Sequence, residues 1–155
     1  MAPTPPIPAL EPAFDVEARL GPLEDHGMTR AGHRRVIPVA GGTITGQIEG
    51  TLLAGGADWQ VVRADGSIEI NGHYSARTNE GELLLIHSVG VRSGAPAVLE
   101  ALLHGEQVDP SEYYFRTAVT IETSASRLRE FEASLYVTSC VREADAVRYT
   151  AYRVT

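Results

Sequence analysis

The sequence predicts an all-β protein, a single antiparallel up-and-down β-barrel of about eight or nine strands with one or two short helices. Most runs of the chain alternate apolar and polar residues, which is the period of a strand with one buried face. Turn signals separate many of these runs at hairpin spacing, at 41–42, 55–56, 65–66 and 79–81. A long, twisted sheet tends to close on itself, because closure removes its exposed edges.

The strands follow in chain order. Segment 13–20 alternates Phe14, Val16, Ala18 and Leu20 with charged residues. The next segments are rich in β-branched residues and lie around the glycine pairs: 33–40, 43–53 and 58–64. Two alternating segments flank the Asn-Glu-Gly turn, and three more combine aromatic with β-branched residues: 67–78, 81–92, 113–123, 134–142 and 146–155.

Two segments predict helices, namely 95–105 and 124–133. The second follows Ser124, a residue that often caps a helix start. Each segment is too short to form a layer of crossover helices, so a parallel α/β sheet is disfavoured.

The composition predicts one barrel domain over 13–155, preceded by a proline-rich arm over 1–12. The chain has 155 residues, 43% of them hydrophobic, which suits a single core. The arm holds no basic region and no long apolar run, so neither a signal peptide nor a membrane anchor is expected. Such an arm often clasps a neighbouring subunit, and we expect a homo-oligomer, a dimer or larger.

Charge and cysteine content narrow the function classes. The formal charge of -7 gives phosphate backbones no general attraction, so nucleic acid is not an expected partner. Cys140 is the only cysteine, which excludes an internal disulfide and fits a reducing cytoplasm. A buried apolar thiol is the favoured interpretation of Cys140 over a nucleophile.

Cofactor sites are not indicated. The five histidines have neither the i,i+4 spacing of a helix nor the His-x-His spacing of a strand, so no metal is predicted. No glycine pair forms a P-loop or a dinucleotide fingerprint, and no nucleotide cofactor is expected.

The strand 113–123 carries one mixed polar face. Tyr114, Arg116 and Glu122 share this face, opposite an apolar one. If the mixed face lines the barrel, Arg116 could grip a carboxylate or carbonyl oxygen with two donors, and Glu122 could transfer a proton. The alternative is that Arg116 and Glu122 are exterior charges of a barrel.

The strand 58–64 and its neighbour supply the other candidates. Asp58 is a candidate proton acceptor, and Trp59 a wall of the pocket; alternatively, the pair reflects turn chemistry with Trp59 plugging one barrel end. Tyr74, with Tyr114, could donate to a developing oxyanion or be a satisfied core tyrosine. We include Arg63 and His73 as further ligand contacts.

Three stretches carry a resemblance to a known family: "IPVAGGTITGQIEGTLLAGGADWQVVRADG", "HYSARTNEGELLLIHSVGVR" and "YYFRTAVTIET". From Ile37 onward the chain resembles the domain-of-unknown-function family 3237, also called uncharacterised protein family 0311. The resemblance implies a compact, calycin-like antiparallel barrel and no assigned general activity. Two departures stand out: His73 replaces the arginine of the family's "aRY" motif, and the segment around Phe131 to Ala133 replaces its Trp-Leu-Asn.

The leading functional hypothesis is a cofactor-independent isomerase, cyclase or lyase. Its substrate would be a small carbonyl-bearing or aromatic metabolite bound inside the barrel. The alternative is a carrier that binds such a molecule without chemistry. A third class, an oligomeric structural protein, would have a barrel packed solid.

Overall fold

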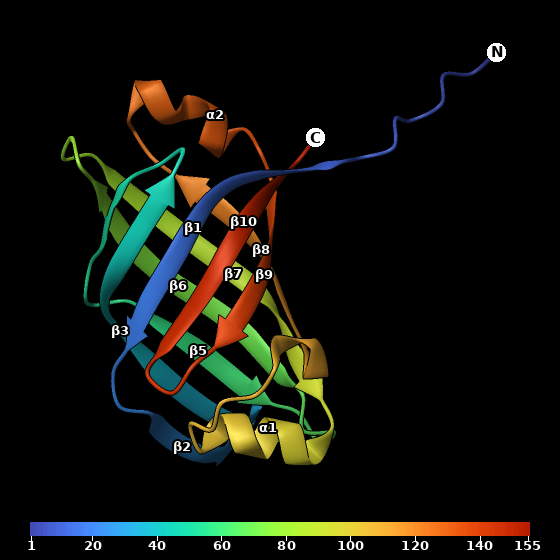
Figure 1. The fold of residues 1–155 in the computed structure, drawn as a ribbon, viewed down its shortest axis with the longest axis vertical. Helices are drawn as coiled ribbons and strands as arrows, with labels where there is room; N and C mark the ends of the chain where they lie inside the picture. Colours follow the sequence, from blue (N-terminus) through green and yellow to red (C-terminus); the bar gives the residue numbers. More distant parts are fainter.

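The protein is a closed antiparallel barrel of eight strands with two additional short strands. Figure 1 shows the strands wrapped around one interior. This computed structural model describes residues 1–155. The strands are β1 Leu10–Leu20, β2 Glu24–Thr29, β3 Gly32–Gly46, β4 Gly50–Leu52, β5 Ala57–Val62, β6 Ile68–Thr78, β7 Leu83–Gly94, β8 Tyr113–Glu122, β9 Tyr136–Arg142 and β10 Ala146–Val154. The predicted all-β barrel is confirmed.

The sheet closes through β1. This strand pairs with β10 on one side and with β3 on the other, so Val16 lies opposite both Tyr149 and Ile44. Between β3 and β6, the short strands β4 and β5 each pair with both neighbours. Every strand pairing is antiparallel. Strand β2 pairs with β3 alone, and β5 lies off the main strand order, between β3 and β6.

Alternation decides which side chains enter the barrel. Along β8 every second residue is buried, from Tyr113 to Ile121, and the residues between them are exposed. The inward face of β6 follows the same period from Ile68 to Thr78. The apolar residues of these faces converge on one core of 25 buried side chains.

Short helices lie at opposite ends of the barrel (Figure 1). At one end α2, Arg129–Glu132, places Phe131 against Phe14 and Tyr136, with the Phe131 and Tyr136 rings stacked at 6.2 Å. At the other end α1, Pro96–Leu103, follows directly after β7 and buries Leu99 and Leu102. Two 3-10 turns, Pro110–Glu112 and Ser126–Leu128, complete the helical content. Neither α-helix has the length and apolar character that crossing a membrane requires.

Two predicted boundaries are wrong. The glycines at 41 and 42 were expected to form a turn, but β3 runs through them and the expected strand 43–53 divides between β3 and β4. Gly42 has a φ of 150°, and a Cβ there would lie 2.0 Å from the carbonyl oxygen of Glu17. The glycine pair therefore lets β3 bend tightly against β1 instead of reversing the chain.

The N-terminal region differs slightly from the expected arm. Strand β1 begins at Leu10, because Leu10 pairs with Val154 and the backbone of Ala9 with that of Thr155. Residues 1–9 carry no strand or helix, are exposed, and project away from the barrel (Figure 1).

Candidate functional site

A cavity lies inside the barrel and opens toward the α1 end. Its walls include Leu20 at the end of β1, Arg142 at the end of β9, and Arg92 near the end of β7, the strand that leads into α1. The space open to the centre of a water molecule is about 60 Å³. This exceeds the room that one water needs, so the barrel is not packed solid.

A second hollow of about 450 Å³ adjoins the cavity at this end. The two share the side chains of Leu20, Ile37, Arg92 and Arg142. Leu103 of α1 lines the outer part. We call the inner space the cavity and the outer one the mouth.

A hydrogen-bonded chain crosses the cavity wall from β3 to β5. Arg35 Nη2 donates to Gln60 Oε1 at 3.1 Å, and Gln60 Nε2 donates to Asp58 Oδ2 at 2.8 Å. The backbone N–H of Asn71 donates to the other Asp58 oxygen at 2.9 Å. The register of β3 and β5 explains the hydrogen bond between Arg35 and Gln60, because these residues lie directly opposite each other on the paired strands.

Burial raises the pKa of Asp58 above its ordinary value, although its two hydrogen bonds and the nearby charges of Arg92 and Arg35 act in the opposite direction. A carboxyl with a raised pKa is a better proton acceptor near neutral pH than an ordinary one. Asp58 therefore has the environment of a proton-transfer group.

Two phenols meet across the barrel. Tyr74 of β6 and Tyr149 of β10 place their hydroxyl oxygens 2.7 Å apart, and both side chains are buried. Burial raises the pKa of both above the ordinary value, so both stay protonated. One hydrogen bond between two hydroxyls uses only one of their two protons. The second proton is free to donate to a molecule in the cavity.

Three arginines line the mouth. Arg35, Arg92 and Arg142 form no ion pair with any carboxylate, and Arg92 donates no hydrogen bond at all within the protein. Arg92 is only 2% exposed, and its guanidinium lies over the Phe115 ring at 5.3 Å. Burial and then the charges of Arg142 and Arg35 lower the pKa of Arg92 to about 10. Arg92 is thus a buried cation without an anionic partner.

A chain of hydroxyls completes the polar lining. Ser88 Oγ donates to Thr117 Oγ1 at 2.8 Å, Thr117 and Thr138 share a bond of 2.5 Å, and Thr138 Oγ1 lies 3.1 Å from Cys140 Sγ. Burial raises the pKa of the Cys140 thiol to about 11. Cys140 is therefore protonated at neutral pH and is not poised as a nucleophile.

The structure brings only two of the predicted site residues to the cavity, Asp58 and Tyr74. Tyr114, Arg116 and Glu122 lie on the outer face of β8, so their expected place inside the barrel is wrong. The apolar face of β8 turns inward because it buries more apolar surface. Outside, Arg116 lies over the Tyr114 ring at 5.5 Å, and both border an open groove of about 680 Å³.

Trp59, Arg63 and His73 also lie outside. Trp59 is 38% exposed and its ring centroid is 6.2 Å from that of His73, so Trp59 neither lines the cavity nor plugs an end of the barrel. His73 stacks on His87 at 3.8 Å. Arg63 Nε pairs with Glu69 Oε1 at 3.1 Å. Parity along β5 explains the placement, since Asp58 and Gln60 point inward and Trp59 lies between them.

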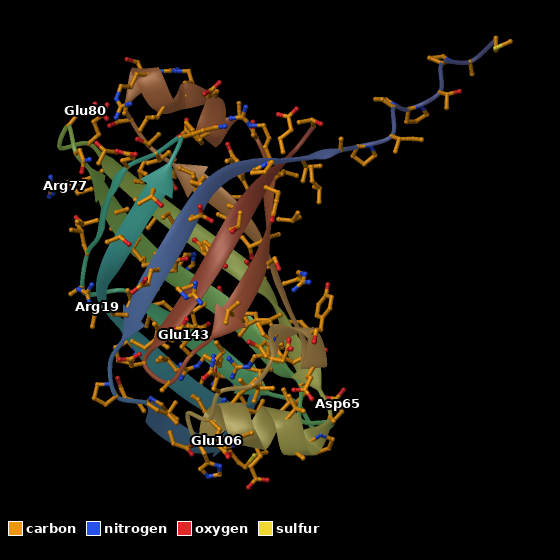
Figure 2. All side chains as sticks on the ribbon, in the orientation of Figure 1. Arg19, Asp65, Arg77, Glu80, Glu106 and Glu143 are labelled. Atoms are coloured by element: carbon orange, nitrogen blue, oxygen red, sulfur yellow. The ribbon has the colours of Figure 1, made fainter.

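Sequence reasoning missed Arg35, Gln60, Arg92, Arg142 and Tyr149. A signal existed for Arg92, which follows Leu84, Ile86 and Ser88 at every second position of β7. A charged residue on the apolar face of a strand is rare unless it has a role. Several exposed charges are paired instead: Glu80, labelled at the edge of the molecule in Figure 2, pairs with Arg127, and Glu143 pairs with Arg148.

Comparison with known proteins identifies relatives across most of the chain. Residues 8–154 match the family described as "Protein of unknown function (DUF3237)". A protein of the uncharacterised family UPF0311 from Bradyrhizobium diazoefficiens is 36% identical over 141 residues, covering 91% of this chain and 93% of the relative. Another, from Clostridium acetobutylicum, is 34% identical and covers 80% of this chain and 79% of the relative.

Solved structures share the fold. A protein of unknown function from Rhodopseudomonas palustris superposes with a TM-score of 0.92 at 34% identity, covering 98% of this chain and all of its own. A "beta-barrel like protein" from Acinetobacter baumannii gives 0.85 at 35% identity, covering 98% and 99%. A protein described as an enzyme from Penicillium herquei gives 0.74 at 18% identity, covering both chains fully, a likeness of fold alone. The resemblance seen in the sequence is confirmed, and the chain belongs to the DUF3237 family, also named UPF0311.

Proposed function

We propose that the protein is a cofactor-independent enzyme of the isomerase, cyclase or lyase kind, acting on a small carbonyl-bearing or aromatic molecule inside the barrel. The observation that carries the proposal is that Asp58 and the Tyr74–Tyr149 pair line the same cavity inside the barrel. A proton acceptor and a neutral hydroxyl donor are the two groups that enolisation needs.

The proposed chemistry is a proton transfer. One hydroxyl of the Tyr74–Tyr149 pair has a proton that the bond between them does not use, and this O–H donates a hydrogen bond to the substrate's carbonyl oxygen. Asp58 meanwhile takes a proton from the carbon next to the carbonyl. The electrons of the broken C–H bond form a C=C bond, and the oxygen becomes an enolate held by the phenol. Return of the proton from Asp58 to another atom gives an isomer; loss of a leaving group or ring closure at the enolate gives a lyase or cyclase.

The surroundings support each role. The raised pKa of both tyrosines keeps them as donors, and the raised pKa of Asp58 brings its basicity toward neutral pH. The apolar walls of the cavity, Ile37, Val39 and Ile70 among them, strengthen electrostatic interactions with a developing oxyanion. The Penicillium herquei protein of similar fold is described as an enzyme, and the chemistry proposed here rests on the residues alone.

Deuterium uptake tests the proposal without knowledge of the substrate. A small-molecule extract of the producing cells is incubated in D₂O with wild type, D58N or E122Q, and mass spectrometry records which compounds gain deuterium or change composition. We expect at least one compound to react with wild type and with E122Q. With D58N the same compound should react at least about 10²-fold more slowly. Glu122 is the matched control because it is an exposed carboxylate on the outer face.

A carrier without catalytic activity is the second candidate. It is favoured by one feature: both Asp58 oxygens already accept hydrogen bonds, from Gln60 and from the Asn71 backbone. A carrier predicts saturable binding, no deuterium uptake with any variant, and little change of affinity in D58N.

The proposal also places the protein in the cytoplasm, as part of a homo-oligomer. A reducing compartment suits Cys140, a buried and unpaired thiol. The exposed residues 1–9 are available to clasp a second copy.

A further inference from the structure

We infer that the natural ligand of the cavity carries a carboxylate, which binds to Arg92 where the cavity meets the mouth. This inference rests on the site of the proposed function and names its substrate class. It does not depend on whether any reaction follows binding.

The first reason is the state of Arg92. Its side chain is almost completely buried, its Nε has no partner, and no carboxylate of the protein forms an ion pair with it. Burying a charged group without a partner is strongly unfavourable, so proteins pair buried charges or use them. No hydrogen bond within the protein occupies the Arg92 guanidinium, so its two terminal nitrogens remain as donors for a ligand.

The second reason is the contrast with the surface. Three exposed arginines form ion pairs although pairing contributes little there: Arg63 with Glu69, Arg127 with Glu82, and Arg148 with Glu143. The arginines of the mouth are unpaired where a missing partner is most unfavourable. The chain contains 20 acidic residues, so the lack of a partner at Arg92 is not a shortage of carboxylates.

The third reason is the charge around Arg92. Arg35 and Arg142 line the same mouth, and each lowers the pKa of Arg92 by repulsion. Asp145, which also lines the mouth, raises the pKa of Arg142. The charge of Asp58 acts on all three arginines, and its oxygens are occupied by Gln60 and the Asn71 backbone. An arriving anion therefore relieves repulsion among the three arginines and meets the guanidinium of Arg92, which forms no hydrogen bond within the protein.

The shape of the site favours a carboxylate on an apolar body. One unpaired guanidinium presents a planar fork that matches one planar, singly charged carboxylate. Arg92 lines both the cavity and the mouth, so a carboxylate bound there leaves the rest of the ligand inside the barrel. There it meets Phe115, Ile70 and the hydroxyls of Tyr74 and Tyr149.

Calorimetric titration with benzoate and benzamide tests the inference. The two probes have nearly the same size and shape but differ in charge. We expect benzoate to bind wild type at least about tenfold more tightly than benzamide, and R92M to lose this preference. R92K should keep the charge but bind benzoate more weakly than wild type, because lysine lacks the planar fork.

R116M is the matched control, since it removes an arginine from the outer face and should leave benzoate binding unchanged. Circular dichroism and thermal melting establish that each variant is folded. Equal binding of the two probes, no binding of benzoate to wild type, or retained preference in folded R92M would overturn the inference. Tighter binding of phenyl phosphate than of benzoate would also overturn the assignment to a carboxylate.

The outcome is separable from that of the proposed function. Benzoate binding that depends on Arg92, without deuterium uptake that depends on Asp58, supports the carboxylate and favours the carrier. Deuterium uptake that depends on Asp58, with no preference for benzoate over benzamide, supports the proposed enzyme activity and contradicts the proposed carboxylate on the ligand.

Discussion

The hydroxyl pair of Tyr74 and Tyr149 gives a quantitative prediction about the cavity. Its two oxygens are 2.7 Å apart, both rings are buried, and neither hydroxyl has another partner in the protein. Removing one hydroxyl leaves the other buried without its partner, which costs about 1–3 kcal/mol. We therefore expect Y74F and Y149F each to be destabilised by that amount, which lowers the melting temperature by about 2–12 °C at about 2–4 °C per kcal/mol for a domain of this size.

The double variant Y74F/Y149F should be much less destabilised than the sum of the single variants. Replacing both partners by apolar groups of the same shape leaves no unsatisfied hydroxyl, so its expected cost is about 0–1 kcal/mol. Urea denaturation of the four proteins gives the coupling free energy of a double-mutant cycle. Single variants within 0.5 kcal/mol of wild type, with additive effects, would refute the argument that the two phenols depend on each other.

The other predictions concern the cavity and its surroundings. The pKa of Asp58 is raised in the folded protein, so the folded state binds the carboxyl proton more tightly than the unfolded state does. The contribution of Asp58 to the free energy of unfolding therefore falls as pH rises from about 4 toward neutral. D58N should remove that slope from urea-denaturation free energies measured across this range, and an unchanged slope would contradict the assignment. Gly72→Ala places a methyl group in the cavity with ordinary contacts of 3.4 Å to Tyr74 and should weaken benzoate binding in calorimetry without loss of fold; unchanged affinity would place the ligand elsewhere. Cys140, with its pKa raised to about 11, should resist iodoacetamide in the native protein and react in concentrated urea, as peptide mass spectrometry would detect. Removing residues 2–8 should shift sedimentation toward the monomer if the arm clasps a second copy; a full-length monomer would refute that expectation.

Local pattern was sufficient to predict the fold. In β8 every second residue from Tyr113 to Ile121 is apolar or Thr117, and the structure buries those residues. The pattern predicted a turn at glycines 41 and 42, because glycine is common both in turns and where strands approach closely. In the structure these glycines lie within β3 and allow its close approach to β1. Strand β2, Glu24–Thr29, was not predicted because only Gly27 and Met28 interrupt a polar run, and the strand pairs on the outside of β3.

The site was less predictable because it depends on contacts distant in sequence. Tyr74 and Tyr149 are 75 positions apart, and only closure of the barrel brings them together. The misplacement of Arg116 was avoidable, since the opposite face of its strand is the more apolar one and buries more surface. Arg92 was identifiable by the same rule, as a charge on the apolar face of β7, but its lack of a partner becomes visible only in three dimensions.

A crystal structure of the protein with bound benzoate tests the central claim most directly. We expect the benzoate carboxylate within hydrogen-bonding distance of the Arg92 guanidinium, and its ring inside the barrel toward Tyr74 and Tyr149. Benzoate bound instead in the outer groove beside Tyr114 and Arg116, with the cavity unchanged, would contradict the claim that the barrel interior is the functional site.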